Sequence, residues 1–393
     1  MDLKQKISEA VEKLAPELIT LSHEIHDYPE IGLQEHQAVA WQKEILEKYG
    51  FTFESPFCGM DTAYRASRGT VGKGPQIGIL AEYDALKGLG HGCGHNVICA
   101  SSVGAAIALS QALEGEKAAV ILFGTPAEET VGGKIPMADA RVFDHLDCAM
   151  MMHPTAEENL VGVGSLAVTD IYVDFTGKPA HSSKPASGIN ALTSAIALFN
   201  AVNAQLHLWP NKSKINGIIT EGGTAPNIIP GFCHCEFSMR AEKMNQLLPM
   251  YDDFERLAKA AAAMTGAKLK ISHSPFCAER YMNRPLDEAF KANMERLGEP
   301  MKWPDPNRMT GSSDVGAVSL RTPSIHAYLS LHAPGVAGHT PELCAAAASK
   351  RADQVVLLAA KGLAMTGADV FQSEELRKAM REDFEKNAVP NRC

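Results

Sequence analysis

The N-terminal segment carries a hydrophobic residue at every third or fourth position. This spacing predicts one amphipathic helix with a single buried face, whose apolar positions are Ile7, Val11, Leu14, Leu18, Leu21 and Ile25. Pro16 lies inside the segment, so we expect a kink or a new turn there. The segment lacks the continuous apolar core that a signal peptide requires.

From residue 76 to residue 152 the pattern alternates between strand and helix. Short apolar runs at 76–83, 118–124 and 147–152 predict buried strands, and the stretch 97–113, rich in small residues, predicts a helix. Strands that alternate with helices indicate βαβ units. We therefore predict an α/β fold with a mostly parallel sheet that carries helices on both faces.

The order of the predicted elements changes between residues 166 and 273. Here the pattern gives strand, helix, strand, strand, helix and strand, which is the ferredoxin-like order of an α+β domain. Beyond this segment the chain returns to alternating helix and strand. We expect a first domain built from residues 1–165 and 276–393, interrupted by an inserted domain at residues 166–275.

Composition supports two globular domains and argues against several classes of partner. A chain of 393 residues is too long for one ordinary core. The net charge is −9 and no basic run is present, so we expect no nucleic acid partner. No apolar stretch approaches the ~20 residues that cross a bilayer, so we expect no membrane partner. The irregularly spaced cysteines indicate reduced thiols in a cytoplasmic protein.

Polar residues gather where the predicted strands end. In parallel sheets, binding sites form beyond the carboxyl ends of the strands. The polar residues are Glu82 and Asp84 after the first strand, the loop GHGCGHN at 90–96, Glu128 and Glu129 after the second strand, and His153 after the third. All of them are expected at one edge of the sheet.

Cys93 and His95 give the glycine-rich loop its chemistry. A thiolate and an imidazole two residues apart can bind one divalent cation, and thiolate, imidazole and carboxylate are the zinc-binding set. Cys93 can also act as a nucleophile that a neighbouring histidine activates. We favour metal ligation because further ligand types follow at the same sheet edge.

The other candidate ligands each have a structural alternative. Glu128 and Glu129 are adjacent and point in different directions, so one can bind a metal while the other moves protons, although acidic residues also favour helix N-termini. His153 follows an apolar strand and fits either a ligand or a core histidine. His339 precedes a predicted helix, and Gly338 lets the backbone bring its imidazole into a site, but two other histidines lie nearby.

Together these side chains offer one thiolate, three imidazoles and one or two carboxylates. That set exceeds the needs of a single tetrahedral zinc ion and suits two metal ions that share a bridging ligand. Paired metals favour hydrolysis because they lower the pKa of a bound water and stabilise the oxygens of a tetrahedral intermediate.

A series of motifs resembles a known family. In chain order they are HEIHDYPEIGLQE, AEYDALKGLGHGCGHN, GTPAEE, MMHP, FTGKPAHSS, GGTAPNIIP, GSSDVG and AGHTPE. They resemble the dinuclear zinc amidohydrolases and exopeptidases of clan MH, peptidase family M20, in its branch of hippurate, indole-acetyl-amino-acid and p-aminobenzoyl-glutamate hydrolases. Asn96 stands where many hippurate and auxin-conjugate hydrolases carry aspartate, so the loop is more similar to the aminobenzoyl-glutamate and dipeptide-cleaving relatives.

The resemblance implies roles for the residues of the sheet edge. Cys93 would replace a bridging carboxylate used elsewhere in the family, and Glu128 would be the general base and later the general acid. The rest of the metal shell would be His95, Glu129, His153 and His339. Asp84 resembles the aspartate that orients a neighbouring imidazole and tunes its basicity.

The resemblance also implies that the inserted domain, 166–275, is a lid and dimerisation domain beside a catalytic domain. His181 would reach into the partner subunit's site and stabilise the oxyanion. Asn227 and Arg240 match positions that hold the substrate, often by its carboxylate, which suits the forked donors of arginine. A homodimer through the inserted domain follows from the same resemblance.

We therefore predict a metal-dependent amidohydrolase of the N-acyl amino acid amidohydrolase, metallo-dipeptidase or carboxypeptidase type. A water between two divalent ions would attack the amide of a small N-acyl amino acid or dipeptide while Glu128 takes its proton. Zinc is the expected metal, with manganese and cobalt as alternatives. Two rival functions are a hydrolase with Cys93 as nucleophile and a non-catalytic protein that binds a metal or an amino acid derivative.

Overall fold

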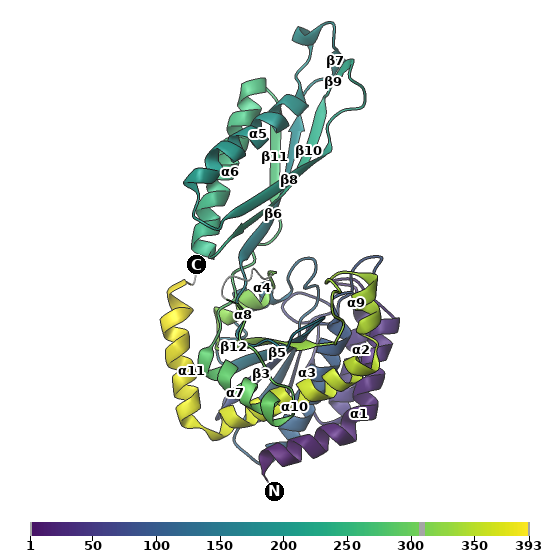
Figure 1. The fold of residues 1–393 in the computed structure, drawn as a ribbon, viewed down its shortest axis with the longest axis vertical. Helices are drawn as coiled ribbons and strands as arrows, with labels where there is room; N and C mark the ends of the chain where they lie inside the picture. The colour runs from purple at the N-terminus through teal and green to yellow at the C-terminus, as the bar shows by residue number, and fades with distance from the viewer. Residues whose placement is uncertain (1, 306–310, 392–393) are drawn as a thin grey trace. The chain divides into compact units, whose positions relative to one another are not determined.

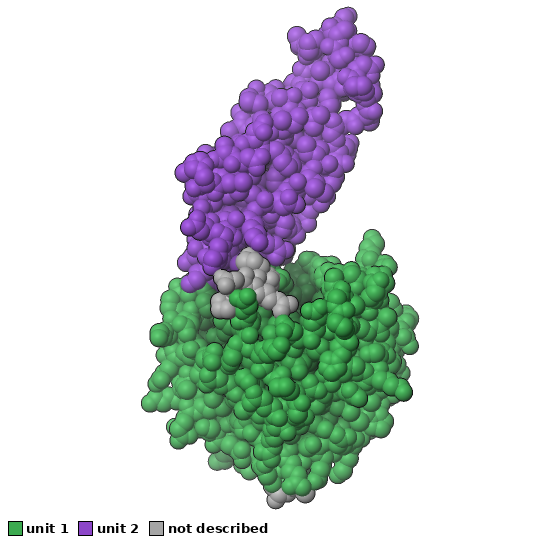
Figure 2. Space-filling view, in the orientation of Figure 1, with its two compact units in different colours: residues 1–164, 280–392 green, residues 165–279, 393 purple. Residues whose placement is uncertain are grey.

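The computed structural model describes residues 2–305 and 311–391. The chain forms two compact units, one made of Met1–Gly164 with Arg280–Arg392 and the other of Ser165–Glu279 (Figure 2). The segment expected as an inserted domain, 166–275, falls within the second unit, which continues as far as Glu279.

The first unit is built around a six-stranded sheet with the strand order β1-β2-β4-β3-β5-β12 (Figure 1). Its strands are β1 Thr52–Glu54, β2 Tyr64–Gly69, β3 Gln76–Ala81, β4 Ala119–Gly124, β5 Cys148–Thr155 and β12 Ser324–Ser330. The neighbours β4, β3, β5 and β12 are parallel, whereas β1 and β2 add an antiparallel edge. The predicted mostly parallel sheet is confirmed, and β12 completes it from the C-terminal part of the chain.

Helices cover both faces of this sheet, as predicted. On β3, Ile77 and Ile79 pack into a core with α1, α3 and α10, whereas Leu80 packs into a second core with α4 and α8. The helices are α1 Leu3–Asp27, α2 His36–Lys48, α3 His95–Ala112, α4 Lys134–Asp139, α7 Arg284–Arg296, α8 Val315–Ser319, α9 Pro341–Ala346, α10 Lys350–Gln372 and α11 Glu374–Asn387, with a 3-10 turn at Val389–Asn391. Because both faces are covered, the carboxyl ends of the strands are where polar chemistry can collect.

Helix α1 confirms the N-terminal prediction in its buried face. All six predicted apolar positions, from Ile7 to Ile25, are at most 2% exposed, and the helix packs on α3 and α10. The new turn expected at Pro16 does not occur, because Pro16 lies within one continuous helix.

Among the described residues, α10 is the one helix long and apolar enough to cross a membrane. In its most apolar window 67% of the residues are buried, and it packs on α1, α3 and α7. Its hydrophobic character is therefore that of a core helix.

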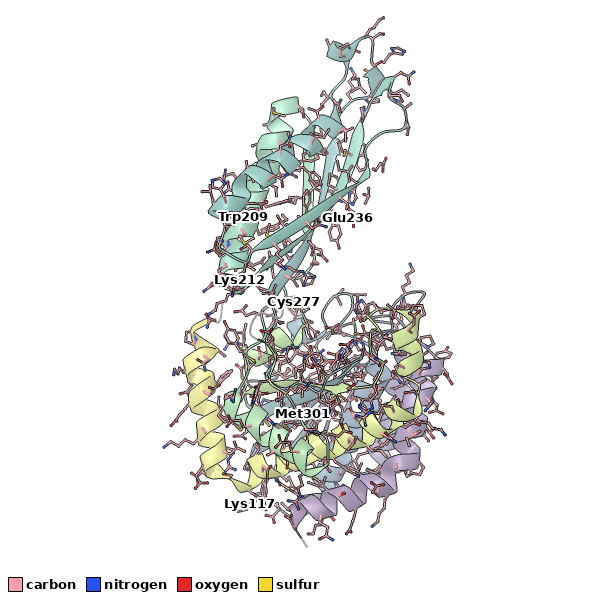
Figure 3. The ribbon with its side chains drawn as sticks, in the orientation of Figure 1. Lys117, Trp209, Lys212, Glu236, Cys277 and Met301 are labelled. Atoms are coloured by element: carbon pink, nitrogen blue, oxygen red, sulfur yellow. The ribbon has the colours of Figure 1, made fainter. Side chains whose placement is uncertain are left out.

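The second unit has the predicted ferredoxin-like order. Its antiparallel sheet runs β11-β6-β10-β8, and α5 and α6 pack on it. The elements are β6 Ala167–Thr176, α5 Ala191–Gln205, β8 Lys214–Glu221, β10 Phe232–Ala241, α6 Met244–Thr265 and β11 Lys268–His273, with 3-10 turns at Pro185–Ser187 and Leu206–Leu208. Trp209, which is labelled in Figure 3, follows the second of these turns. Its indole N–H donates a hydrogen bond to Asp253 on α6. A two-stranded ribbon, β7 Ala180–His181 with β9 Ile228–Ile229, lies at one end of the unit (Figure 1).

Candidate metal and catalytic site

The glycine-rich loop ends in a turn that only glycine accommodates. Gly94 has a φ of +78°, and a Cβ built there would lie 2.5 Å from Cγ of Pro154. This left-handed turn leads directly into α3, so His95 becomes the first residue of the helix. Cys93 and His95 are thereby held on either side of one rigid position.

The other candidate residues reach the same edge from separate elements. Glu82 and Asp84 follow β3, and Glu128 and Glu129 follow β4. His153 does not follow the third strand as predicted; it lies inside β5, opposite Tyr328 of β12.

His339 arrives on a loop that docks onto the glycine-rich segment. Its backbone N–H donates to the carbonyl of Gly92 over 3.0 Å. His339 itself has a left-handed backbone conformation, with a φ of 59°. A non-glycine residue in this conformation is strained, and such strain is common at functional sites.

The predicted ligand atoms converge in two overlapping sets. Those of Cys93, His95 and His153 lie within 4.8 Å of one another, and so do those of Cys93, Glu129 and His339. The two sets share the sulfur of Cys93, which is the arrangement that two ions with one bridging ligand require.

Hydrogen bonds orient two of the histidines toward the centre of the cluster. Nδ1 of His95 lies 2.8 Å from the carbonyl of Asp84, and Nδ1 of His153 lies 2.6 Å from that of Pro154. A carbonyl only accepts, so Nδ1 carries the hydrogen in both rings and the neutral ring presents the lone pair of Nε2. The carboxylate of Asp84 also lies 3.1 Å from Nδ1 of His95 and accepts from the backbone N–H of Glu129.

Several acceptor atoms at this centre are buried without a hydrogen-bond partner, among them Nε2 of His95 and Oε1 of Glu129. Nε2 of His153 lies 3.3 Å from Sγ of Cys93, and Nε2 of His339 lies 3.3 Å from Oε1 of Glu129. Two ligands of one tetrahedral zinc ion lie roughly 3.3–3.8 Å apart, given bonds of about 2.0–2.3 Å. The residues therefore fit divalent metal ions.

Burial and charge affect the protonation of these candidate ligands. Burial raises the pKa of the Cys93 thiol to about 12 and lowers the pKa of His153 to about 4. Burial also opposes a charge on His95, but Asp84 and Cys93 outweigh it and raise the pKa of His95 well above its usual range. Asp84 and Cys93 thus favour a positive charge at the position of this ring.

The proposed proton carrier has its own electrostatic setting. Burial raises the pKa of Glu128 well above its usual range, and the nearby carboxylates of Glu82 and Asp314 add to the shift. A carboxyl group that holds a proton more readily is suited to general acid and base chemistry near neutral pH.

Comparison with known proteins places this geometry in a family. Residues 162–269 match the family model described as the peptidase dimerisation domain. Human Xaa-Arg dipeptidase is 33% identical to this chain over 97% of the chain and 92% of the relative. The chain belongs to the M20 peptidase family. The family resemblance read from the motifs is thereby confirmed.

Further relatives agree with this M20 assignment. One of the p-aminobenzoyl-glutamate hydrolase chains of Escherichia coli is 26% identical, covering 98% of this chain and 96% of its own. The crystal structure of a dinuclear metal binding M20 peptidase from Bacillus subtilis superposes with a TM-score of 0.69 at 19% identity, covering 92% of this chain and 99% of that one, which supports the fold. The M20 chain is a metal-dependent amidohydrolase, and neither rival function is favoured.

Sequence reasoning missed a buried ion-pair network beneath the site of this M20 chain. Lys134 is fully buried, and its Nζ lies 2.6 Å from Glu82 and 2.7 Å from Asp314. Asp314 lies in the GSSDVG motif, so the motif could have indicated a role for it. Glu82 was identified from the sequence only by its position after a strand. Nothing in the pattern around Lys134 indicated burial.

A second missed cluster packs against His153. The rings of His326 and Tyr328 lie with their centroids 5.5 Å from that of His153. Arg280 donates hydrogen bonds to both residues and to the carbonyl of Val163. These contacts support the position of His153 from the neighbouring strand.

The three remaining candidate residues of the M20 chain lie in the second unit. His181 is exposed on β7, with Nδ1 2.8 Å from the hydroxyl of Ser183. The carbonyl of Asn227 accepts from the N–H of Ser182, so His181 and Asn227 lie near the same ribbon. Arg240 lies on β10, opposite Val168 of β6. Their roles in catalysis and substrate binding stay predictions.

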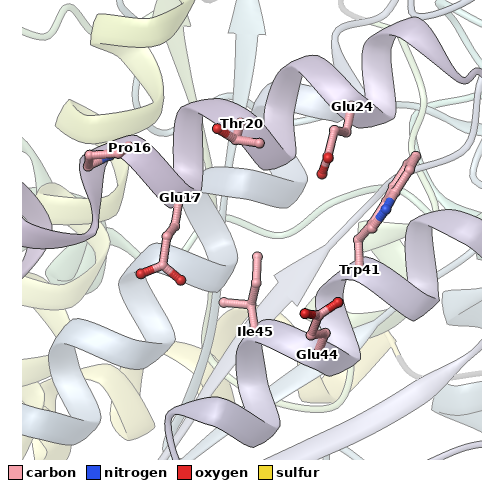
Figure 4. A pocket seen from close by; sticks show the side chains of 7 residues that line it. All are labelled: Pro16, Glu17, Thr20, Glu24, Trp41, Glu44 and Ile45. Atoms are coloured by element: carbon pink, nitrogen blue, oxygen red, sulfur yellow. The ribbon is translucent and has the colours of Figure 1, made fainter.

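A separate groove of about 400 Å³ lies between α1 and α2 (Figure 4). Its lining residues are Pro16, Glu17, Thr20, Glu24, Trp41, Glu44 and Ile45. This lining contains no histidine or cysteine, so it lacks the mixed ligand set found at the sheet edge.

Proposed function

We propose that this chain hydrolyses the amide bond of N-acyl amino acids or dipeptides with the help of two divalent metal ions. The observation that carries the proposal is the convergence of two ligand sets on the sulfur of Cys93. The proposed ligands are Cys93, His95, Glu129, His153 and His339. Zinc suits this mixture of thiolate, imidazole and carboxylate, with manganese and cobalt as alternatives.

The bound ions would supply a water of lowered pKa and polarise the amide carbonyl. Glu128 then takes a proton as general base and returns it to the leaving amine. Asp84 holds the ring of His95 in the orientation that presents Nε2 to the cluster. The partner subunit's His181 would donate to the oxyanion, and Asn227 and Arg240 would hold the substrate carboxylate.

The names of two relatives suggest the leaving group. One is an Xaa-Arg dipeptidase and the other a p-aminobenzoyl-glutamate hydrolase. Arginine at the end of a dipeptide and the glutamate of aminobenzoyl-glutamate both carry a free α-carboxylate. We therefore propose substrates whose leaving amine is an amino acid with a free carboxylate.

A substrate panel tests this proposal. The chain is stripped of metal, reloaded with zinc, manganese or cobalt, and incubated with Xaa-Arg dipeptides, p-aminobenzoyl-glutamate and N-acetyl amino acids. We expect release of the free amine only in the metal-loaded samples, with two ions bound per chain. Equal cleavage without metal, lost on thiol alkylation, would instead support Cys93 as the nucleophile.

We also propose a cytoplasmic homodimer. None of the eight cysteines in the described part of the chain forms a disulfide, as expected in a reducing compartment. The match of residues 162–269 to the dimerisation domain supports pairing through the second unit. Light scattering of the purified chain measures the oligomeric state, and a monomer would contradict this part of the proposal.

A further inference from the structure

Glu82 is a buried carboxylate at the metal cluster to which the proposed mechanism assigns no role. It follows β3 directly and is 0% exposed. Its two oxygens have different surroundings: Oε1 accepts a hydrogen bond from Nζ of Lys134 over 2.6 Å, whereas Oε2 has no hydrogen-bond partner. Burying an unpartnered carboxylate oxygen is costly, so this atom needs a partner.

The free oxygen of Glu82 faces a proposed metal ligand. Oε2 lies 3.5 Å from Nε2 of His95, and Oε1 of Glu129 lies 3.9 Å from the same nitrogen. Neither distance is a good hydrogen bond. A single proton on Nε2 would therefore leave both oxygens poorly satisfied, whereas a metal ion bound to Nε2 can also bond to the free oxygen of Glu82.

The separation of the atoms agrees with shared coordination. Two ligands at about 2.1 Å from one tetrahedral ion lie about 3.4 Å apart. The 3.5 Å between Glu82 and His95 is close to this value. Oε2 of Glu82 lies closer to this nitrogen than Oε1 of Glu129 does, so Glu82 is placed at least as well as Glu129 to share an ion with His95.

A network on the far side fixes the Glu82 carboxylate. Lys134 Nζ also contacts Asp314 over 2.7 Å, and Asp314 accepts from the backbone N–H of Lys134 over 3.0 Å. The network sets one positive charge against two negative charges in a fully buried position. A cation at Oε2 of Glu82 would balance the remaining charge.

We propose that Glu82 supplies Oε2 as an additional ligand to the metal ion held by His95. Lys134 and Asp314 are then positioning residues, because they fix the carboxylate through its other oxygen. This inference rests on the proposed function, since it needs the metal site at which that function takes place.

Metal binding to two Glu82 variants tests the inference. Metal-free wild type, Glu82→Gln and Glu82→Asp are titrated with cobalt, and the bound ions per chain, their affinities and the cobalt absorption spectrum are measured. We expect Glu82→Gln to weaken one of the two ions at least tenfold and to change the cobalt spectrum. Glu82→Asp keeps the charge that pairs with Lys134 but withdraws the oxygen, so we expect a smaller loss of affinity in the same direction.

Asp287→Asn is the matched control. Asp287 is also a buried acid with an unpartnered oxygen, but it belongs to none of the described candidate ligand sets. We expect this variant to bind both ions with wild-type affinity. A general response to the loss of any buried carboxylate would weaken binding here as well and would overturn the assignment to Glu82.

The outcomes separate this inference from the proposed function. If both Glu82 variants bind two ions with wild-type affinity and the wild-type cobalt spectrum, Glu82 is not a ligand, while the proposed function stands. If wild type binds no divalent ion, the proposed function fails. Circular dichroism checks the fold, and if Glu82→Gln does not fold, the affinity and spectrum of Glu82→Asp decide the question.

Discussion

Two histidine–aspartate pairs in this chain place Nδ1 of the ring beside the aspartate carboxylate and differ in their surroundings. In the first unit His95 presents Nδ1 to Asp84, and in the second His234 presents Nδ1 to Asp174. The side chains of the first pair are 1% and 0% exposed, whereas those of the second are each 27% exposed. The two pairs therefore allow a comparison of a histidine–carboxylate contact in a buried setting and in a partly solvated one.

The remaining ring nitrogen shows what burial changes. Nε2 of His95 is buried without a hydrogen-bond partner, beside carboxylate oxygens that also lack one. Nε2 of His234 lies 3.5 Å from Glu236, whose side chain is 46% exposed and can be hydrated. Water stabilises the second arrangement at little cost, whereas the first needs a cation. In this comparison it is the buried pair, and not the partly exposed one, that points to a metal site.

Removing divalent ions should have the largest effect, and this effect should arise at the buried His95–Asp84 pair and not at the His234–Asp174 pair. We expect a chelator to reduce amide hydrolysis to the background rate and to lower the thermal unfolding temperature, with both effects reversed by added zinc, manganese or cobalt. An ion at 100 times its dissociation constant adds about 2.7 kcal/mol to the stability of the folded state. Calorimetry and amine release measure the two effects. Equal hydrolysis in the metal-free and metal-loaded forms would contradict the conclusion that the buried pair belongs to a metal site.

Glu128→Gln should reduce turnover by about 10²–10⁴-fold while both ions stay bound, because general acid–base catalysis supplies an effect of this size. The neighbouring change Glu129→Gln should instead weaken metal binding. Steady-state kinetics and metal analysis on the two variants distinguish a proton carrier from a ligand. Full activity of Glu128→Gln would remove Glu128 from its proposed role.

Gly94→Ala should destabilise the fold and weaken the metal site together. The left-handed backbone adds strain on the order of 1–3 kcal/mol, and the new Cβ would lie 2.5 Å from Cγ of Pro154. Gly266→Ala, at the end of α6, is the control: its φ is +81° but no heavy atom lies within 4 Å of a Cβ built there. We expect the control to lose less stability in chemical denaturation and to keep wild-type metal affinity.

His234→Ala should have the smallest effect, a loss of stability below about 1 kcal/mol, because the pair is partly exposed. The hydrogen bond to Asp174 raises the pKa of His234. The pair's contribution is therefore fully present below the unfolded pKa of about 6.5 and is lost as pH rises through the raised folded value. Thermal unfolding should show a larger difference from wild type at pH 6 than at pH 9. The reverse order would show that the pair is not stabilised by protonated histidine.

The fold was largely predictable from short-range patterns in the sequence. The apolar spacing of α1 identified its buried face, and the strand–helix alternation between residues 76 and 152 predicted the parallel sheet. These predictions succeeded because periodicity reports which face of an element is buried. Of the two alternatives predicted at Pro16, a new turn is wrong, because α1 runs as one continuous helix that packs on α3 and α10.

The gathering of the candidate side chains at one sheet edge was predictable, but their supporting contacts were not. The side chains that follow strands are ordered by the sheet, so their common edge could be inferred. His153 was predicted to follow the third strand but lies inside it, because pairing with β12 extends β5 past this residue. The burial of Lys134 between Glu82 and Asp314 joins residues that lie far apart in the sequence, and no local pattern reports such a contact.

The sequence by itself determined most of the elements, the order of the domains, the family and the chemical types of the candidate ligands, because these depend on local periodicity and on motifs. Only the tertiary structure decided which acceptor atoms are buried together without a hydrogen-bond donor, which acids form ion pairs with Lys134 and which histidine–aspartate pair stays partly exposed to solvent. Those properties depend on distances between separate elements and on the exclusion of water, and both arise only when the elements pack together.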